Sequence, residues 1–187
     1  MNKIIDQTFK VAIYLRLSKE DDDLSCSSGA KSESNSISNQ RKLIYDFMKS
    51  HPELELYDEY KDDGKSGSNF DRAEFQRMMK DIEAGKVNCV IVKDQSRFGR
   101  DYIDVGKYKE KIFPKLGVRF ITINEGYDSL SATSSDDLAF TINSFVYDFY
   151  IRDISTKIRT NLTAKKQNGE YAGAFVAYGY VKDSNDK

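Results

Sequence analysis

The chain has 187 residues, of which 39% are hydrophobic and 32% charged, so it can bury one sizeable core and has the composition of a globular protein. Its 29 basic and 30 acidic residues give a net charge of −1, and its two cysteines lack the spacing of a zinc site or a disulfide framework. No apolar run approaches the roughly 20 residues of a membrane span, and no signal-like segment opens the chain, so we expect a cytoplasmic protein without a membrane partner.

Short β-prone runs alternate with amphipathic segments over the first two thirds of the chain. The expected strands are residues 9–17, 54–60, 88–93 and 118–123. The expected helices are residues 36–50, 72–84 and 102–116. This alternation predicts a three-layer α/β domain around a mostly parallel sheet, which we assign to residues 1–133.

A long helix is expected next, because residues 134–168 contain no proline or glycine and carry apolar residues at helical spacing. About 30 helical residues span about 45 Å, more than the domain requires to cover its own sheet. The first half is apolar enough to contact another subunit, and the second half is basic. Its candidate DNA-binding residues are Arg152, Lys157, Arg159, Lys165 and Lys166. A packing helix with a solvated tail is the alternative. Residues 169–187 are interpreted as the truncated start of a second, DNA-binding domain.

Two short motifs follow expected strands and suggest the chemistry. The first is Tyr14-Leu15-Arg16-Leu17-Ser18, in which Arg16 and Ser18 would share one face of an extended chain. The second runs from Lys93 to Arg100, where Arg97 and Arg100 would share one helical face. A hydroxyl beside several guanidinium groups suits attack on a phosphodiester, because arginine can carry the extra negative charge.

Other chemistries are disfavoured by residue content. His51 is the only histidine, so neither a Ser-His-Asp triad nor a histidine metal cluster can form within the chain. The Gly64-Lys65-Ser66 segment lacks the earlier glycine of a phosphate-binding loop. The acidic clusters at residues 21–23 and 62–63 leave a Mg²⁺-dependent nuclease open as an alternative.

Together the two motifs resemble the serine recombinase family, and the likeness extends over about residues 9–168. This resemblance implies a resolvase-like fold and a reaction in which Ser18 attacks DNA and becomes joined to its 5′ end. It implies double-stranded DNA as the substrate, no metal, cofactor or small-molecule substrate, and self-association into a dimer and a synaptic tetramer. The other catalytic residues that it implies are Arg16, Gln40, Arg72, Lys93, Arg97 and Arg100. Lys157 falls where the family's long helix usually carries an arginine.

The chain departs from the family pattern at Ser96, where many members carry an aspartate that can serve as the general acid. Asp94 is near in sequence, but we expect it to face a different way. The long segment of residues 19–35 and the Tyr178-Gly179-Tyr180 step resemble the large serine recombinases of mobile elements, including conjugative transposons. Such a protein would carry out site-specific recombination that integrates or excises the element. A catalytically silent DNA-binding or oligomerisation module and a phospho-accepting signalling domain are further alternatives.

Overall fold

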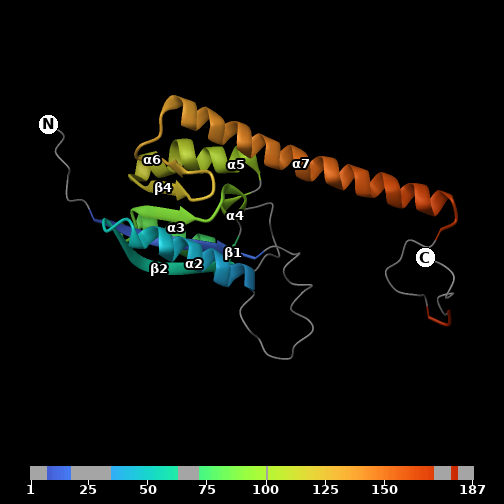
Figure 1. Cartoon of the computed structure of the whole chain (residues 1–187), viewed down its shortest axis with the longest axis horizontal. Helices are drawn as coiled ribbons and strands as arrows, with labels where there is room; N and C mark the ends of the chain where they lie inside the picture. Colours follow the sequence, from blue (N-terminus) through green and yellow to red (C-terminus); the bar gives the residue numbers. More distant parts are fainter. Residues whose placement is uncertain (1–7, 18–34, 63–71, 100, 171–177, 181–187) are drawn as a thin grey trace. The chain divides into compact units, whose positions relative to one another are not determined.

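The computed structural model describes residues 8–17, 35–62, 72–99, 101–170 and 178–180. It divides into two units, residues 1–148 and residues 149–187. The first unit holds the sheet and the helices that cover it (Figure 1). Its sheet has the order β2-β1-β3-β4-β5.

The sheet is parallel except at one edge. Its strands are β1 (Phe9–Arg16), β2 (Leu54–Asp62), β3 (Cys89–Val92), β4 (Arg119–Thr122) and β5 (Tyr127–Asp128). Ile13 lies opposite Ile91, which lies opposite Ile121, so the three central strands are in step. Only β5 runs antiparallel, paired with β4. The carboxyl ends of β1, β2 and β3 therefore meet along one side of the sheet.

Helices follow the strands in alternation. They are α2 (Asn35–Lys49), α3 (Ala73–Glu83), α4 (Gln95–Phe98), α5 (Tyr102–Lys107), η1 (Tyr108–Ile112), α6 (Phe113–Leu116) and α7 (Ser134–Gln167). The sequence pattern predicts one helix over residues 102–116, whereas the structure has α5 and α6 joined by the π-helical turn η1.

Each face of the sheet has its own core, because successive strand residues point to opposite sides. Ile13 packs with Ile37 and Ile44 of α2 on one face. Tyr14 packs with Phe75 of α3 and the rings that follow it on the other face. The three-layer arrangement predicted from sequence is confirmed, and so is the long C-terminal helix.

The start of α7 is held in the first unit by an ion pair whose lysine is buried and whose aspartate is half-exposed. Lys109, on the π-helical turn, lies 2.7 Å from a carboxylate oxygen of Asp137 and is 7% exposed. Its ammonium also lies over the rings of Tyr127 and Phe140, at 5.0 and 4.9 Å from their centroids. Tyr127 donates its hydroxyl to the same carboxylate at 2.9 Å. The first turns of α7 are thus held by charge as well as by apolar packing.

We expect Phe75→Ala to lower the free energy of unfolding by about 3–5 kcal/mol, because it empties a site that the rings of Tyr14, Phe98 and Tyr108 surround. The matched control is Tyr57→Ala on the exposed part of β2, where we expect a change of about 0.5 kcal/mol. Urea unfolding measures both, and equal losses in the two variants would contradict this account of the core.

Candidate active site

Reciprocal hydrogen bonds between two arginines tie the carboxyl end of β1 to α4. Arg16 is 1% exposed. Its Nε donates to the carbonyl of Arg97 at 3.0 Å, and its Nη2 donates to the carbonyl of Ser96. Arg97 returns a bond from its Nη1 to the carbonyl of Arg16 at 3.3 Å. Two positive charges are thereby held at the carboxyl end of the sheet by backbone oxygens.

Gln40 fixes the same end of β1 from the other layer. It is fully buried on α2, and its Nε2 donates to the carbonyl of Arg16 at 3.2 Å. Its Oε1 accepts a longer bond from the backbone N–H of Arg16 at 3.4 Å. Nε2 also lies 3.2 Å from the hydroxyl of Ser36. Gln40 therefore holds the peptide of Arg16, the residue two positions before Ser18.

Arg72 joins the ends of β1 and β2 to the end of α4. The side chain is 5% exposed, and its Nη1 donates to the hydroxyl of Tyr14 at 2.8 Å and to the carbonyl of Phe98 at 3.0 Å. Tyr14 in turn donates to Asp62 at 2.9 Å. Since Tyr14 is two residues before Arg16 on β1, both side chains point to the same face of the sheet.

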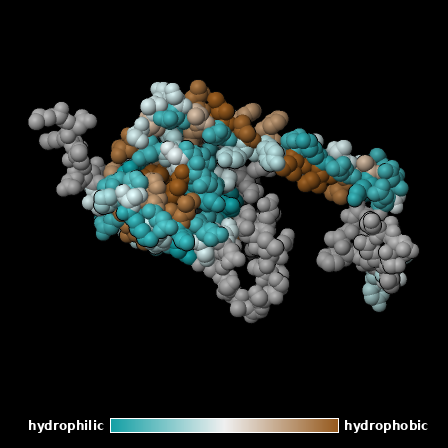
Figure 2. All heavy atoms as spheres, in the orientation of Figure 1, coloured by the Kyte–Doolittle hydropathy of each residue, from teal (hydrophilic) through white to brown (hydrophobic). Residues whose placement is uncertain are grey.

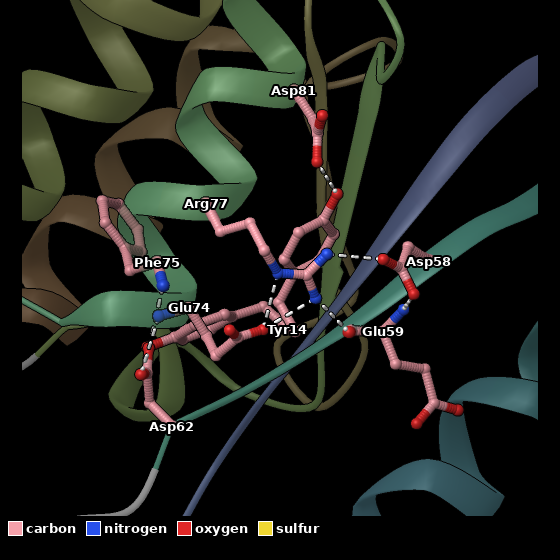
Figure 3. A network of polar contacts seen from close by, with 9 residues as sticks. Tyr14, Asp58, Glu59, Asp62, Glu74, Phe75, Arg77 and Asp81 are labelled. Carbon is pink, nitrogen blue, oxygen red and sulfur yellow. Dashed lines mark hydrogen bonds and ion pairs between the residues drawn. The ribbon is translucent and has the colours of Figure 1, made fainter.

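Asp62 also anchors the beginning of α3, as Figure 3 shows. Its carboxylate accepts the backbone N–H groups of Glu74 at 3.1 Å and of Phe75 at 2.9 Å. Arg77 then holds the helix against β2, with Nη1 2.6 Å from Asp58. Because α3 is fixed at its first turn, the residue directly before it, Arg72, is fixed as well.

The Tyr14 hydroxyl stays protonated in this setting. Burial raises the pKa of Tyr14 above its usual value, and Asp62 acts in the same direction, while the nearby Arg72 partly opposes them. The neutral phenol can therefore accept from Arg72 and donate to Asp62 at once. It is the neutral link between a buried cation and a buried anion.

Asp94 does not face away from Ser96, so the expectation drawn from sequence is wrong. The Asp94 carboxylate accepts the Ser96 hydroxyl at 2.6 Å and the backbone N–H of Arg97 at 3.1 Å. It is the residue that caps α4, and its other oxygen lies 3.9 Å from Nε of Arg97. An aspartate three residues before an N–H it can accept is a capping pattern, and this signal was present in the sequence.

The expected helical turn through Arg97 and Arg100 is also wrong, because α4 ends at Phe98 and Gly99 is extended. Arg100 and Ser18 themselves lie outside the described residues. Lys93 is half-buried, and its carbonyl accepts the backbone N–H of Asn124 at 2.9 Å. Of the seven candidate catalytic residues, the structure brings Arg16, Gln40, Arg72 and Arg97 into one connected set of hydrogen bonds.

The basic residues proposed for DNA contact lie on α7. Arg152, Lys157, Arg159, Lys165 and Lys166 are all exposed. Lys157 pairs with Asp153, one turn earlier, at 2.7 Å. An exposed pair of this kind contributes little to stability, so a phosphate can displace the carboxylate at small cost.

Among the described residues, no helix combines the length and apolarity that a bilayer crossing requires. The same residues contain no group of three or more His, Cys, Asp or Glu side chains placed to share a metal ion.

Comparison with known proteins identifies the family of this chain. A family model described as the N-terminal domain of resolvase matches residues 11–171. The chain belongs to the resolvase family. It carries a serine recombinase catalytic domain and is a site-specific DNA recombinase, as the sequence resemblance predicted.

Two solved structures similar to this resolvase-family chain are each 27% identical to it in sequence. The N-terminal catalytic domain of TP901-1 integrase matches with a TM-score of 0.57, over 76% of this chain and 97% of that one. A resolvase family site-specific recombinase from Streptococcus pneumoniae matches with a TM-score of 0.53, over 86% of this chain and 99% of that one. No curated protein matches the chain.

Three further polar residues belong to this hydrogen-bonded site although none was chosen from sequence as a catalytic candidate: Tyr14, Asp62 and Asp94. The position of Tyr14 was available from the two-residue period of β1, which places it beside Arg16. Asp62 lies beyond the strand expected at residues 54–60, whereas in the structure it is the last residue of β2 and is 7% exposed. Asp62 pairs with Arg16 in the register of β1 and β2, so a carboxylate at the end of the strand beside Arg16 is the signal that would have identified it.

We expect Tyr14→Phe to lower the free energy of unfolding by about 1–2 kcal/mol at about pH 8, because it leaves Arg72 and Asp62 each short of one partner. The gap should shrink as the pH rises above about 10. The wild-type phenol has a raised pKa in the fold, so its proton is lost first from the unfolded state, which then gains stability.

Urea unfolding of both proteins at about pH 8 and about pH 11 measures the gap. The other buried tyrosines are present in both proteins, so their contribution drops out of the difference in the free energy of unfolding between wild type and variant. A gap that widens with pH would contradict the assignment of Tyr14 as the neutral donor.

Proposed function

We propose that Ser18 is the nucleophile of this recombinase and that Arg16, Arg72 and Arg97 stabilise the phosphate during cleavage. The observation that carries the proposal is that all three arginines bond to the backbone of residues 16 and 96–98, at the end of the strand that leads to Ser18. Each guanidinium group has five N–H donors in a planar fork, which fits phosphate oxygens. A scissile phosphate would compete with backbone carbonyls for these donors and would offer them a full negative charge.

The reaction exchanges one phosphodiester for another. The Ser18 oxygen forms a bond to phosphorus as the bond from phosphorus to the 3′ oxygen breaks. Ser18 loses a proton and the 3′ oxygen gains one, so the overall proton count does not change. The product is a 5′-phosphoserine linkage and a free 3′ hydroxyl. Because the linkage keeps the energy of the broken bond, attack by a 3′ hydroxyl of another end reseals DNA without ATP.

Arginine charge is the main catalytic contribution in this scheme. The transition state spreads negative charge over the equatorial oxygens of phosphorus, and buried cations stabilise that charge strongly. Lys93, Arg97 and Arg100 share one short segment of the chain, and by family resemblance we assign all three to this task. Gln40 contributes by holding the Arg16 peptide.

The substrate that we propose is a recombination site in double-stranded DNA, and the outcome is integration or excision of a mobile element. One similar structure is named an integrase and the other a site-specific recombinase, which supports this outcome. The exposed basic residues of α7, from Arg152 to Lys166, are proposed to contact the DNA backbone. Contacts of this kind are electrostatic, so binding should weaken steeply with salt.

We propose that α7 also joins two copies of the chain. At 34 residues it spans about 51 Å, and apolar side chains are exposed along it, as Figure 2 shows in brown. Leu138, Ile142, Val146, Ile154, Ile158 and Leu162 are between 37% and 61% exposed. An apolar row of this length is typical of a contact with another subunit. A dimer formed in this way is the unit from which a synaptic tetramer would assemble.

We expect Ser18→Ala to abolish the covalent protein–DNA adduct while leaving the fold intact. The measurement is adduct trapping on a suicide substrate whose nicked strand diffuses away, with the linked residue mapped by mass spectrometry. Circular dichroism and urea unfolding verify the fold of the variant. Adduct formation at the wild-type level would overturn the assignment of Ser18.

The same assay in EDTA separates the proposal from its rivals. We expect the wild-type adduct to form at an unchanged rate, because the proposed charge stabilisation uses arginines. Cleavage that requires Mg²⁺ and leaves no adduct would favour the metal-dependent nuclease. DNA binding with no cleavage at all would favour a silent module, and labelling of an aspartate by a small phosphodonor would favour the signalling domain.

We expect Ile142→Asp to weaken self-association by at least about tenfold, because it places a charge in the proposed contact. The matched control is Asn143→Asp, which adds the same charge at the next exposed position of α7. Sedimentation equilibrium measures both dissociation constants. Equal effects of the two variants would place the contact elsewhere.

A further inference from the structure

The turn after β4 makes a series of hydrogen bonds to the segment that carries the candidate catalytic residues Lys93 and Arg97. The backbone N–H of Ile123 donates to the carbonyl of Val92 at 3.2 Å, and that of Asn124 donates to Lys93 at 2.9 Å. Glu125 continues this series with its side chain, whose Oε1 accepts the backbone N–H of Gln95 at 3.1 Å. Gln95 is the first residue of α4. The turn therefore holds the chain up to the point where α4 begins.

A glycine closes this turn and sets the direction of Glu125. Gly126 has a φ of +61°, a conformation that residues with a Cβ rarely adopt, and its N–H donates to the carbonyl of Ile123 at 3.1 Å. The chain then returns as β5, antiparallel to β4. Glu125 consequently lies at the tip of a tight turn and faces α4.

Glu125 is placed where its charge is disfavoured. Burial is the main cause that raises the pKa of its carboxyl group, and the N–H of Gln95 only partly opposes this. Among the described residues, its Oε2 has no hydrogen-bond partner. The bond that Oε1 accepts from Gln95 is made to the backbone of α4.

The orientation of α4 matters because its carbonyls are the acceptors for two candidate catalytic arginines. Ser96 and Arg97 hold Arg16, and Phe98 holds Arg72. A helix of four residues is not stable by itself, so it depends on contacts from outside. Asp94 provides one of these contacts, to the N–H of Arg97, and Glu125 provides another, to the N–H of Gln95.

We infer that Glu125 is a positioning residue for the arginine cluster: it accepts the first N–H of α4 and so fixes the carbonyls to which Arg16 and Arg72 bind. Its effect on the reaction rests on the proposed function. The acceptor oxygen is what the role requires, so glutamine can replace Glu125 and an apolar residue cannot.

Hydrogen exchange tests the contact itself, with no need for activity. We expect the Gln95 amide to exchange at least about tenfold faster in Glu125→Leu than in the wild type, and at the wild-type rate in Glu125→Gln. Amides of β1 and α2 should be unchanged in all three proteins. Unchanged exchange of Gln95 in Glu125→Leu would overturn the inference, and Glu125→Ala repeats the test if the leucine variant fails to fold.

Single-turnover cleavage at saturating DNA tests the consequence. We expect adduct formation to slow by about 10- to 100-fold in Glu125→Leu with an unchanged dissociation constant for DNA, and to stay within about threefold of the wild type in Glu125→Gln. The control is Glu53→Leu. Glu53 directly precedes β2, and its carboxylate contacts Arg119. The rate of this variant should match that of the wild type.

Two outcomes of the cleavage assay contradict the inference. Adduct formation by Glu125→Leu at the wild-type rate would show that the contact does not serve the site. Equal loss in the leucine and glutamine variants would show that charge, and not the acceptor, is required. If the wild type forms no adduct, the proposed function fails, and the exchange measurement alone decides the placement of α4 by Glu125.

Discussion

The reciprocal bonding of Arg16 and Arg97 is the constraint on which the site depends. Arg16 is buried at the end of β1 and Arg97 is half-buried beside it, so bulk water screens these two like charges poorly. Backbone carbonyls, which are dipoles, accept the hydrogen bonds of both guanidinium groups. The carboxylates are less direct partners, because Asp62 is reached through Tyr14 and Asp94 lies 3.9 Å from Nε of Arg97. The cluster thus has three guanidinium groups against the two carboxylates, and under the proposed function a phosphodiester supplies the remaining negative charge.

The parts of this site that sequence could predict are those set by local periodicity. The strand that ends in Arg16 and the helix α3 follow from the periods of strand and helix, and both were predicted to within one residue at each end. Gln40 is buried beside Arg16 because it is on the face of α2 that packs against β1, while the catalytic role that the family resemblance implies for it stays a prediction.

The parts that sequence could not predict depend on contacts between distant segments. The brevity of α4 is set by Gly99 and by carbonyls that bind arginines from elsewhere, so the regular spacing of Arg97 and Arg100 was a misleading signal. Glu125 is 30 residues from Gln95 in the chain, and no local pattern connects them. The two-residue strand β5 is likewise too short to leave a period, and it exists because the turn at Gly126 returns the chain to β4.

The Lys109–Asp137 ion pair opposes movement of the start of α7 along or about its own axis. A slide of one residue, or a partial rotation about the helix axis, would carry Asp137 away and leave an ammonium stranded between the rings of Tyr127 and Phe140. Displacement of the first two turns is therefore penalised. This part of α7 keeps its axial position and its rotation relative to the sheet because one lysine has its charge partner and its ring contacts in that arrangement alone among the described contacts.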